Sequence, residues 1–299
     1  MSKEKTKFLL QATRPKTLPA SVGPVLVGVG LSGIESLKSN FLIAFQILIC
    51  AALLQIGANL ANDFIDAEKG VDKSDRLGPT RVTSSGLVDV KTVRNATIIV
   101  FLLASLVGLN LVITGGIPIL ILGLICIFIA VAYTAGQRPL SHMAMGEFLA
   151  FIFFGPVAVA GTNYLLSGDF TLSSILIGFG PGFIALSLMA INNMRDRLSD
   201  MKSKKLTLAV LFGDGFSRKL PIFGIVGSAI VPVVTAFYLN SIFIITASLT
   251  WILFINNWRG VLYSPIDRKQ NLNLAATGKY SLVYGVIYAI CLLVSSSNH

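Results

Sequence analysis

Residues 41–60 read FLIAFQILICAALLQIGANL, a run of 20 residues without a single charged side chain. A helix needs roughly 20 mostly apolar residues to cross the hydrocarbon core of a bilayer. Lipid offers no hydrogen-bond partner to open backbone groups, so a segment that crosses it must be helical. The run therefore predicts a transmembrane α-helix.

The rest of the chain shares this composition. Hydrophobic residues make up 54% of the 299 residues and charged residues only 13%, whereas a soluble domain carries about 25% charged residues. An ordinary soluble globule and a disordered chain are both excluded. Further apolar runs cover residues 18–32, 96–112, 117–133, 146–166, 172–191, 220–239, 242–254 and 280–294, with short turns at 115–116 and 240–241. We therefore expect an all-α polytopic membrane protein with nine transmembrane helices, folded as a single domain over residues 1–299.

The distribution of basic residues predicts the orientation in the membrane. If nine spans alternate sides, every one of the 24 Lys and Arg residues except Lys38 falls on the same side. Basic loops resist translocation, so we place that side, and the N-terminus, in the cytoplasm. The first run follows a basic segment and shows no clear cleavage site, which predicts a retained helix rather than a cleaved signal. The net charge of +10 then reflects this bias and contact with anionic membrane lipid, and no nucleic-acid partner is expected.

Acidic residues are scarce, yet they gather at the ends of two predicted helices. The chain has 14 Asp and Glu residues. The first group follows the run at 41–60 and the second follows the run at 172–191. Their members are Asn59, Asn62, Asp63, Asp66, Glu68, Asp72 and Asp75 in the first group, and Asn192, Asp196 and Asp200 in the second. Spacings of three and four residues place these oxygens on shared helix faces.

Stacked carboxylates repel one another unless a cation lies between them. Oxygen ligands of this kind suit Mg²⁺, which typically binds a few carboxylates together with substrate phosphates. Basic residues follow each group, among them Lys73 and Arg81 after the first and Lys205 after the second. Acids for a metal beside bases for phosphate predict a diphosphate-binding site. The alternative is a solvated, salt-bridged loop, but acids at a membrane edge are usually functional.

Other features favour plainer interpretations. The two histidines, His142 and His299, argue against a histidine-rich metal site or a Ser-His-Asp triad. Gly28, Gly30 and Gly33 spell GxGxxG inside an apolar helix, which indicates helix packing rather than dinucleotide binding. Tyr133 is equally compatible with an interfacial aromatic anchor. The role of Glu147 stays open between helix capping or packing on one side and a functional contact on the other. His142 is interpreted as part of a cytoplasmic loop.

A transporter or channel is the alternative of another class, because it too combines many apolar helices with intramembrane acids. Transporters often bind their substrates at the bilayer midplane on broken helices. Here the acids lie at one membrane edge with bases beside them, which favours chemistry on a phosphate.

The two motifs resemble those of the UbiA superfamily of intramembrane aromatic prenyltransferases. They read Asn62-Asp63-x-x-Asp66 and Asp196-x-x-x-Asp200, and the similarity includes Tyr133-Thr134, Gly146-Glu147 and Phe154-Gly155-Pro156. The strings at 14–20, 66–81, 192–196 and 205–210 are similar to the branch that acts on dihydroxynaphthoate. Many superfamily members place an Asp four residues after the Asp66 position, where this chain has Gly70 and Asp72 follows. Whether Glu68 or Asp72 faces the metal therefore stays open.

The resemblance implies transfer of a polyprenyl chain from polyprenyl diphosphate to 1,4-dihydroxy-2-naphthoate, with loss of CO₂ and diphosphate and with Mg²⁺ as cofactor. Another acceptor, 4-hydroxybenzoate or homogentisate, is the runner-up. The resemblance also implies a UbiA-type helix bundle in the plasma membrane, with the active site toward the cytoplasm.

The resemblance assigns roles to individual residues. It implies Asp66, Asp196 and Asp200 as catalytic residues, and Asn62, Asp66, Asp72, Asp196 and Asp200 as metal ligands. Substrate binding falls to Arg14, Asn59, Asn62, Asp63, Lys73, Arg81, Tyr133, Asn192 and Lys205. Within that set, Arg14 is the candidate for the acceptor's carboxylate.

Overall fold

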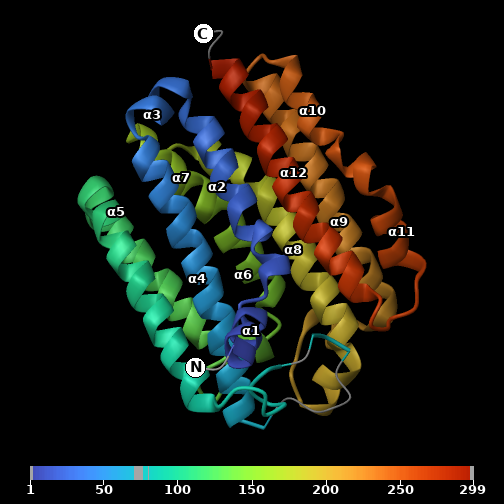
Figure 1. Cartoon of the computed structure of the whole chain (residues 1–299). Coiled ribbons are helices and arrows are strands. Elements are labelled where there is room, and N and C mark those ends of the chain that lie inside the picture. Colours follow the sequence, from blue (N-terminus) through green and yellow to red (C-terminus); the bar gives the residue numbers. More distant parts are fainter. Residues whose placement is uncertain (1–2, 71–76, 80, 297–299) are drawn as a thin grey trace.

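The computed structural model describes residues 3–70, 77–79 and 81–296 as a bundle of helices (Figure 1). The α-helices are α1 (Lys3–Ala12), α2 (Pro19–Ser32), α3 (Ile34–Ser39), α4 (Phe41–Glu68), α5 (Val90–Ala132), α6 (Gly146–Ile152), α7 (Ala158–Ser167), α8 (Leu172–Lys202), α9 (Leu208–Tyr238), α10 (Ile245–Ser248), α11 (Ile255–Tyr263) and α12 (Gln270–Ser296). Short 3₁₀ segments are η1 (Pro15–Thr17), η2 (Leu140–His142), η4 (Ile242–Ile244) and η5 (Thr250–Phe254), and η3 (Phe153–Val157) is a π-helix. Among these described residues no strand forms, and one isolated bridge joins Met143 to Leu206.

Seven helical segments are long and apolar enough to cross a membrane, and α2 is a shorter apolar helix of 14 residues. Each predicted run overlaps one of these segments. The prediction of an all-α, multi-pass membrane protein is therefore confirmed. The total of nine crossings and the cytoplasmic placement of the N-terminus stay predictions.

The longest helix, α5, is broken where the sequence predicted a turn. Gly116 adopts φ 69° and ψ −157°, a conformation that residues with a Cβ rarely adopt. Before this break Asn110 donates to Gln46 near the start of α4, and after α5 ends Thr134 donates to Asn62 near the end of α4. The 43 residues of α5 therefore run up and then back along the bundle.

Several helices extend beyond the apolar runs from which they were predicted. The second predicted helix ended at Leu60, but α4 continues to Glu68 and carries the first acidic group on its last turns. A short helical turn precedes the helix predicted from 220. It starts at Leu208, where the Thr207 side chain accepts a hydrogen bond from the Val210 amide, and α9 is then broken at Gly213, which adopts φ 76° and ψ −173°. Polar side chains on the last turns of α4 hid the true end of that helix.

The glycine-rich stretch of α2 serves helix packing, as the sequence predicted. A Cβ on Gly28 would lie 2.6 Å from the Thr162 side chain, and one on Gly30 would lie 2.5 Å from the backbone of Ala289. Such close approach of two backbones is available only to small residues. Glycine thereby lets α2 lie directly against α7 and α12.

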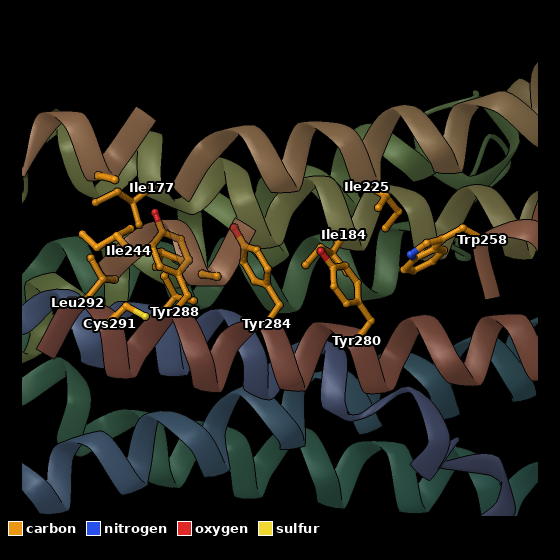
Figure 2. Packing of buried hydrophobic residues seen from close by; sticks show 14 residues of the cluster. Ile177, Ile184, Ile225, Ile244, Trp258, Tyr280, Tyr284, Tyr288, Cys291 and Leu292 are labelled. Carbon is orange, nitrogen blue, oxygen red and sulfur yellow. The ribbon is translucent and has the colours of Figure 1, made fainter. Parts of the chain in front are cut away.

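The largest apolar cluster joins α12 to α8 and α9. Tyr280, Tyr284 and Tyr288 project from one face of α12 and are completely buried (Figure 2). Their hydroxyls are bonded to Ser228 and Thr235 of α9, with Tyr288 lying 2.7 Å from the Thr235 hydroxyl. Buried phenols need such partners, so this side of the bundle is a packed scaffold.

The two acidic groups lie at the same end of this scaffold. The C-terminal ends of α4 and α8 both reach the lower end of the bundle in Figure 1, where α1 and the connecting loops also lie. The C-terminus of the chain lies at the opposite end. The fold therefore brings the two predicted motifs together.

Candidate active site

A large cavity of about 1030 Å³ opens among α1, α2, α4–α8 and the start of α12. One part is lined by apolar side chains, among them Ile47, Leu54, Leu111 and Leu165. The other part lies at the end of the bundle that holds the acidic groups and is lined by charged and amide side chains. Most predicted site residues line it, namely Arg14, Asn59, Asn62, Asp66, Arg81, Tyr133, Asn192, Asp200 and Lys205.

A polar stripe on α4 forms one wall. Gln55, Asn59, Asn62 and Asp66 all line the cavity, and their spacings of four, three and four residues place them on one helix face. Gln55 donates to the Thr17 carbonyl at 2.9 Å, and Asn59 donates to the Thr13 carbonyl at 3.0 Å. The first half of the stripe thus anchors the turn between α1 and α2.

That turn carries Arg14 into the cavity wall. Arg14 has φ 53° and ψ 61°, the left-handed region that a residue with a Cβ seldom adopts. Its carbonyl accepts hydrogen bonds from both the amide and the hydroxyl of Thr17, each at 2.9 Å. The two amide contacts from α4 hold the turn on either side, so the position of Arg14 is determined by α4.

Asp63 lies on another face of α4 and is 3% exposed. Its carboxylate accepts the backbone N–H groups of Thr83 at 3.0 Å and Val82 at 3.3 Å. It does not line the cavity. Asp63 instead fixes the loop that precedes α5.

The same loop brings Arg81 to Asp66. The Arg81 guanidinium donates to the Asp66 carboxylate at 2.9 Å, with side-chain exposures of 9% and 18%. Both side chains line the cavity. Carboxylate and guanidinium are therefore presented side by side in the cavity, where the carboxylate suits a metal and the guanidinium suits a phosphate.

The end of α8 forms the facing wall with Asn192 and Asp200. Lys205, in the connection to α9, places its Nζ 3.5 Å from the Asp200 carboxylate. The α8 wall therefore repeats the pairing of an acid with a base seen at Asp66 and Arg81.

Asp196 differs from Asp200 because a buried arginine binds it. Arg195 donates to both Asp196 carboxylate oxygens, at 2.8 and 2.7 Å, and the pair is almost completely buried. Arg195 also donates to Asn192 and to Asn271 at the start of α12, each at 2.8 Å. Asn271 in turn donates to the Leu77 carbonyl at 3.0 Å. Asp196 does not line the cavity but belongs to a network that joins α8, α12 and the loop before α5.

The segment after α5 closes the polar end. Thr134 donates to Asn62, and Lys69 donates to the carbonyls of Thr134 at 2.6 Å and Gly136 at 2.8 Å. The neighbouring Tyr133 lines the same cavity as Asp66 and Asp200. Both acidic walls therefore border one cavity.

For three predicted or candidate binding residues the structure places no side chain in the cavity wall. Glu68 is exposed and does not line the cavity. Asp72 and Lys73 lie outside the described residues. Their predicted roles stay predictions.

The family comparison matches residues 21–283 to the UbiA prenyltransferase family. The chain belongs to this family. The matched region contains both acidic motifs and the helices that form most of the cavity.

Relatives within the UbiA family agree in name. The chain is 37% identical over 221 residues to the 1,4-dihydroxy-2-naphthoate octaprenyltransferase of Escherichia coli, covering 72% of this chain and 71% of the relative. It is 35% identical over 211 residues to the enzyme of the same name from Mycobacterium tuberculosis, covering 71% of this chain and 72% of the relative. These likenesses favour an enzyme over a transporter.

Solved structures share the UbiA fold. A UbiA homolog from Archaeoglobus fulgidus bound to DMAPP and Mg²⁺ superposes with a TM-score of 0.63 at 18% identity, covering 96% of this chain and 99% of that one. The apo UbiA homolog from Aeropyrum pernix K1 gives a TM-score of 0.65 at 15% identity, covering 93% and 97%. At these identities the likeness establishes the fold.

The side chains at the polar end fit a divalent cation of the magnesium type. Within the described part of the chain, no three His, Cys, Asp or Glu side chains form a cluster that could hold a metal without other ligands. The cavity nevertheless presents oxygen donors from Asn62, Asp66, Asn192 and Asp200. Mg²⁺ commonly takes one or two carboxylates and completes its shell with phosphate and water, so a donor set of this size suits a metal bound together with a diphosphate.

Several residues at the site were missed by the sequence analysis. Gln55 continues the stripe of Asn59, Asn62 and Asp66 one turn earlier, and this spacing was a readable signal. Asn271 donates to the Leu77 carbonyl far away in the sequence, and no local pattern marks it. Lys69 is one of the bases that follow the first acidic group, but nothing local predicts its bonds to the carbonyls of Thr134 and Gly136.

Proposed function

We propose that this chain transfers a polyprenyl group from a polyprenyl diphosphate to 1,4-dihydroxy-2-naphthoate, with loss of CO₂ and diphosphate. One observation carries the proposal: a single cavity joins two acid–base pairs, Asp66–Arg81 and Asp200–Lys205, to a long apolar hollow. A diphosphate with a hydrocarbon tail has that division of polarity. The names of the relatives support the choice of acceptor.

Mg²⁺ is the cofactor in this proposal, held by Asn62, Asp66 and Asp200, with Asp72 as a further ligand. Bound there, the cation neutralises charge that builds up on the departing diphosphate. Arg81, Lys73 and Lys205 bind the phosphate oxygens and stabilise the same charge.

Asp63 and Asp196 support these groups from behind. Asp63 holds the loop that carries Arg81, and Arg195 holds Asp196 within the network under α8. Asp196 does not line the cavity, so it acts on the site through the residues that it holds. Both residues are therefore positioning residues in this proposal.

The acceptor approaches the polar end, where Arg14 binds its carboxylate and Asn59 keeps Arg14 in place. Tyr133, which lines the same cavity, orients the reacting ends. The apolar lining binds the prenyl tail and keeps water away from the allylic cation that forms when the C–O bond breaks. The electron-rich ring then captures that cation.

We further propose that the chain acts as one domain in the plasma membrane, with the polar end of the cavity toward the cytoplasm. The excess of Lys and Arg at that end supports this orientation. Both substrates then reach the cavity without crossing the bilayer, the tail from lipid and the aromatic acid from water.

The full chain in proteoliposomes with Mg²⁺, geranylgeranyl diphosphate and dihydroxynaphthoate tests the proposal. We expect a prenylated, decarboxylated product by mass spectrometry, and its loss on addition of EDTA. Parallel reactions with 4-hydroxybenzoate and homogentisate separate the acceptor classes. Folded protein that makes no prenylated product from any acceptor contradicts the proposal, and preference for another acceptor contradicts the choice of dihydroxynaphthoate.

A further inference from the structure

His142 lies in the cavity wall on a rigid support. It ends the 3₁₀ turn η2, whose Ser141 amide donates to the Tyr133 carbonyl at 3.0 Å. The next turn is held by the Ala144 amide, which donates to the Leu206 carbonyl at 2.9 Å. His142 therefore keeps a fixed place beside Tyr133 and the connection that carries Lys205.

The imidazole lies among charged groups of the polar end. Lys205 from the α8–α9 connection, Asp66 from α4 and Lys69 just after α4 all act on it. Burial lowers the pKa of His142 below its ordinary value of 6.5, Lys205 and Lys69 lower the pKa further, and Asp66 partly opposes them. The imidazole is therefore neutral at physiological pH. The hydrogen bonds of the described residues include none to the imidazole.

The other proton acceptors of the cavity are engaged. Among the described lining residues, Asp66 is bonded to Arg81 and Asp200 lies beside Lys205. The Tyr133 hydroxyl points to the Met189 sulfur at 3.6 Å. Glu147 does not line the cavity, and it accepts a hydrogen bond from Asn193 at 3.0 Å behind the wall. His142 is left as the neutral base that faces the substrate space.

We infer that His142 is the catalytic base that removes the proton from the acceptor hydroxyl next to the ring carbon that is prenylated. This inference rests on the proposed function, because it requires a hydroxylated aromatic acid as the acceptor. An ionised hydroxyl donates electron density into the ring, which speeds capture of an allylic cation. Histidine is the side chain that most often serves as such a general base, and only its neutral form can accept the proton.

The proton and electron balance closes without another reactant. As the prenyl carbon bonds to the carboxylate-bearing ring carbon, its bond to the diphosphate oxygen breaks and the hydroxyl proton passes to His142. The ring product is then a β-keto acid, since the former hydroxyl carbon is now a carbonyl. The bond to the carboxylate breaks, CO₂ leaves, and its electron pair restores the aromatic ring. The imidazolium returns its proton to the ring oxygen, so His142 ends the cycle neutral.

The pH dependence of turnover by the full chain tests the role. With Mg²⁺, geranylgeranyl diphosphate and dihydroxynaphthoate, we expect kcat of the unsubstituted chain to fall as pH drops through the lowered pKa of the histidine. His142→Gln keeps a polar side chain of similar size but cannot take the proton. We expect it to lower kcat at neutral pH by about 100-fold or more, to abolish the acidic limb, and to leave KM for the diphosphate substrate little changed.

A matched control and a rescue keep a folding defect apart from the chemistry. Met143→Leu changes an exposed neighbour that does not line the cavity, and we expect it to behave as the unsubstituted chain. For His142→Ala we expect added imidazole to restore part of the rate, because the small base enters the cavity through the space of the missing side chain.

The outcomes separate the two proposals. An active chain whose His142→Gln variant keeps both its kcat and its acidic limb overturns the role of His142 and leaves the proposed function standing. A His142→Gln variant that only raises KM, with the acidic limb intact, also overturns this role. An unsubstituted chain that prenylates no hydroxylated aromatic acid overturns both proposals.

Discussion

The Arg81 guanidinium donates to the Asp66 carboxylate at 2.9 Å, although 15 residues of chain separate them. The contact depends on Asp63, one helical turn earlier, which binds the backbone of the two residues after Arg81. Two carboxylates on adjacent faces of α4 therefore do different work. Asp63 determines where the loop lies, and Asp66 faces the cavity together with Arg81, which lies on that loop.

Substitution of Asp66 is expected to impair metal use more than folding. Asp66→Asn keeps the shape of the side chain but removes its charge. We expect kcat for prenyl transfer to fall by about 100-fold or more and the Mg²⁺ concentration for half-maximal rate to rise, measured by Mg²⁺ titration in proteoliposomes. Asp214→Asn is the control, since Asp214 pairs with Arg197 at 2.6 Å and does not line the cavity. An unchanged Mg²⁺ dependence in Asp66→Asn would exclude the ligand role.

Substitution of Asp63 is expected to impair folding stability more than metal use. Asp63→Ala leaves the buried amides of Val82 and Thr83 without their acceptor. Hydrogen bonds to a charged group contribute about 1.5–3 kcal/mol each, so we expect a clear drop in Tm in detergent. Activity should fall with it, because Arg81 loses its position. If Asp63→Ala melts at the temperature of the unsubstituted chain, the anchoring role of Asp63 is wrong.

The buried pair of Arg195 and Asp196 gives a test of charge in the protein interior. Arg195→Met leaves the Asp196 carboxylate buried without its bidentate partner, and breaking such a pair destabilises proteins by about 3–5 kcal/mol. We expect a large loss of Tm. Replacing Asp196 by Leu in the same chain should recover much of the stability while prenyl transfer stays low. Equal losses of Tm in the single and the double variant would contradict this account.

Much of the site was predictable because polar residues are so costly inside lipid. Asn62, Asp66 and Asp200 stood out in the sequence because polar residues at the end of a membrane helix are costly and are usually functional. The break at Gly116 was also readable, because two glycines interrupt an apolar run that is too long for one crossing.

What the sequence could not supply is which acids face the cavity. Asp63 and Asp66 look alike in the sequence, and so do Asp196 and Asp200. Their roles are separated by partners far along the chain, such as the Thr83 amide for Asp63. The helix ends were missed for a related reason. Polar side chains at 214–219 resemble a loop, whereas α9 already resumes there after its break at Gly213.

Glycine substitutions test whether close packing of α2 supports the scaffold. A Cβ on Gly30 would lie 2.5 Å from the Ala289 backbone, so α2 and α12 must separate to admit it. Overpacking of this kind costs about 1–3 kcal/mol, and we expect Gly30→Ala to lower Tm. Gly215→Ala in α9 is the matched control, because nothing lies within 4 Å of its added Cβ. Alanine forms helix better than glycine, so that variant should melt at or slightly above the original temperature. Equal Tm values for the two variants would mean that the contact between α2 and α12 yields easily and does not hold the scaffold.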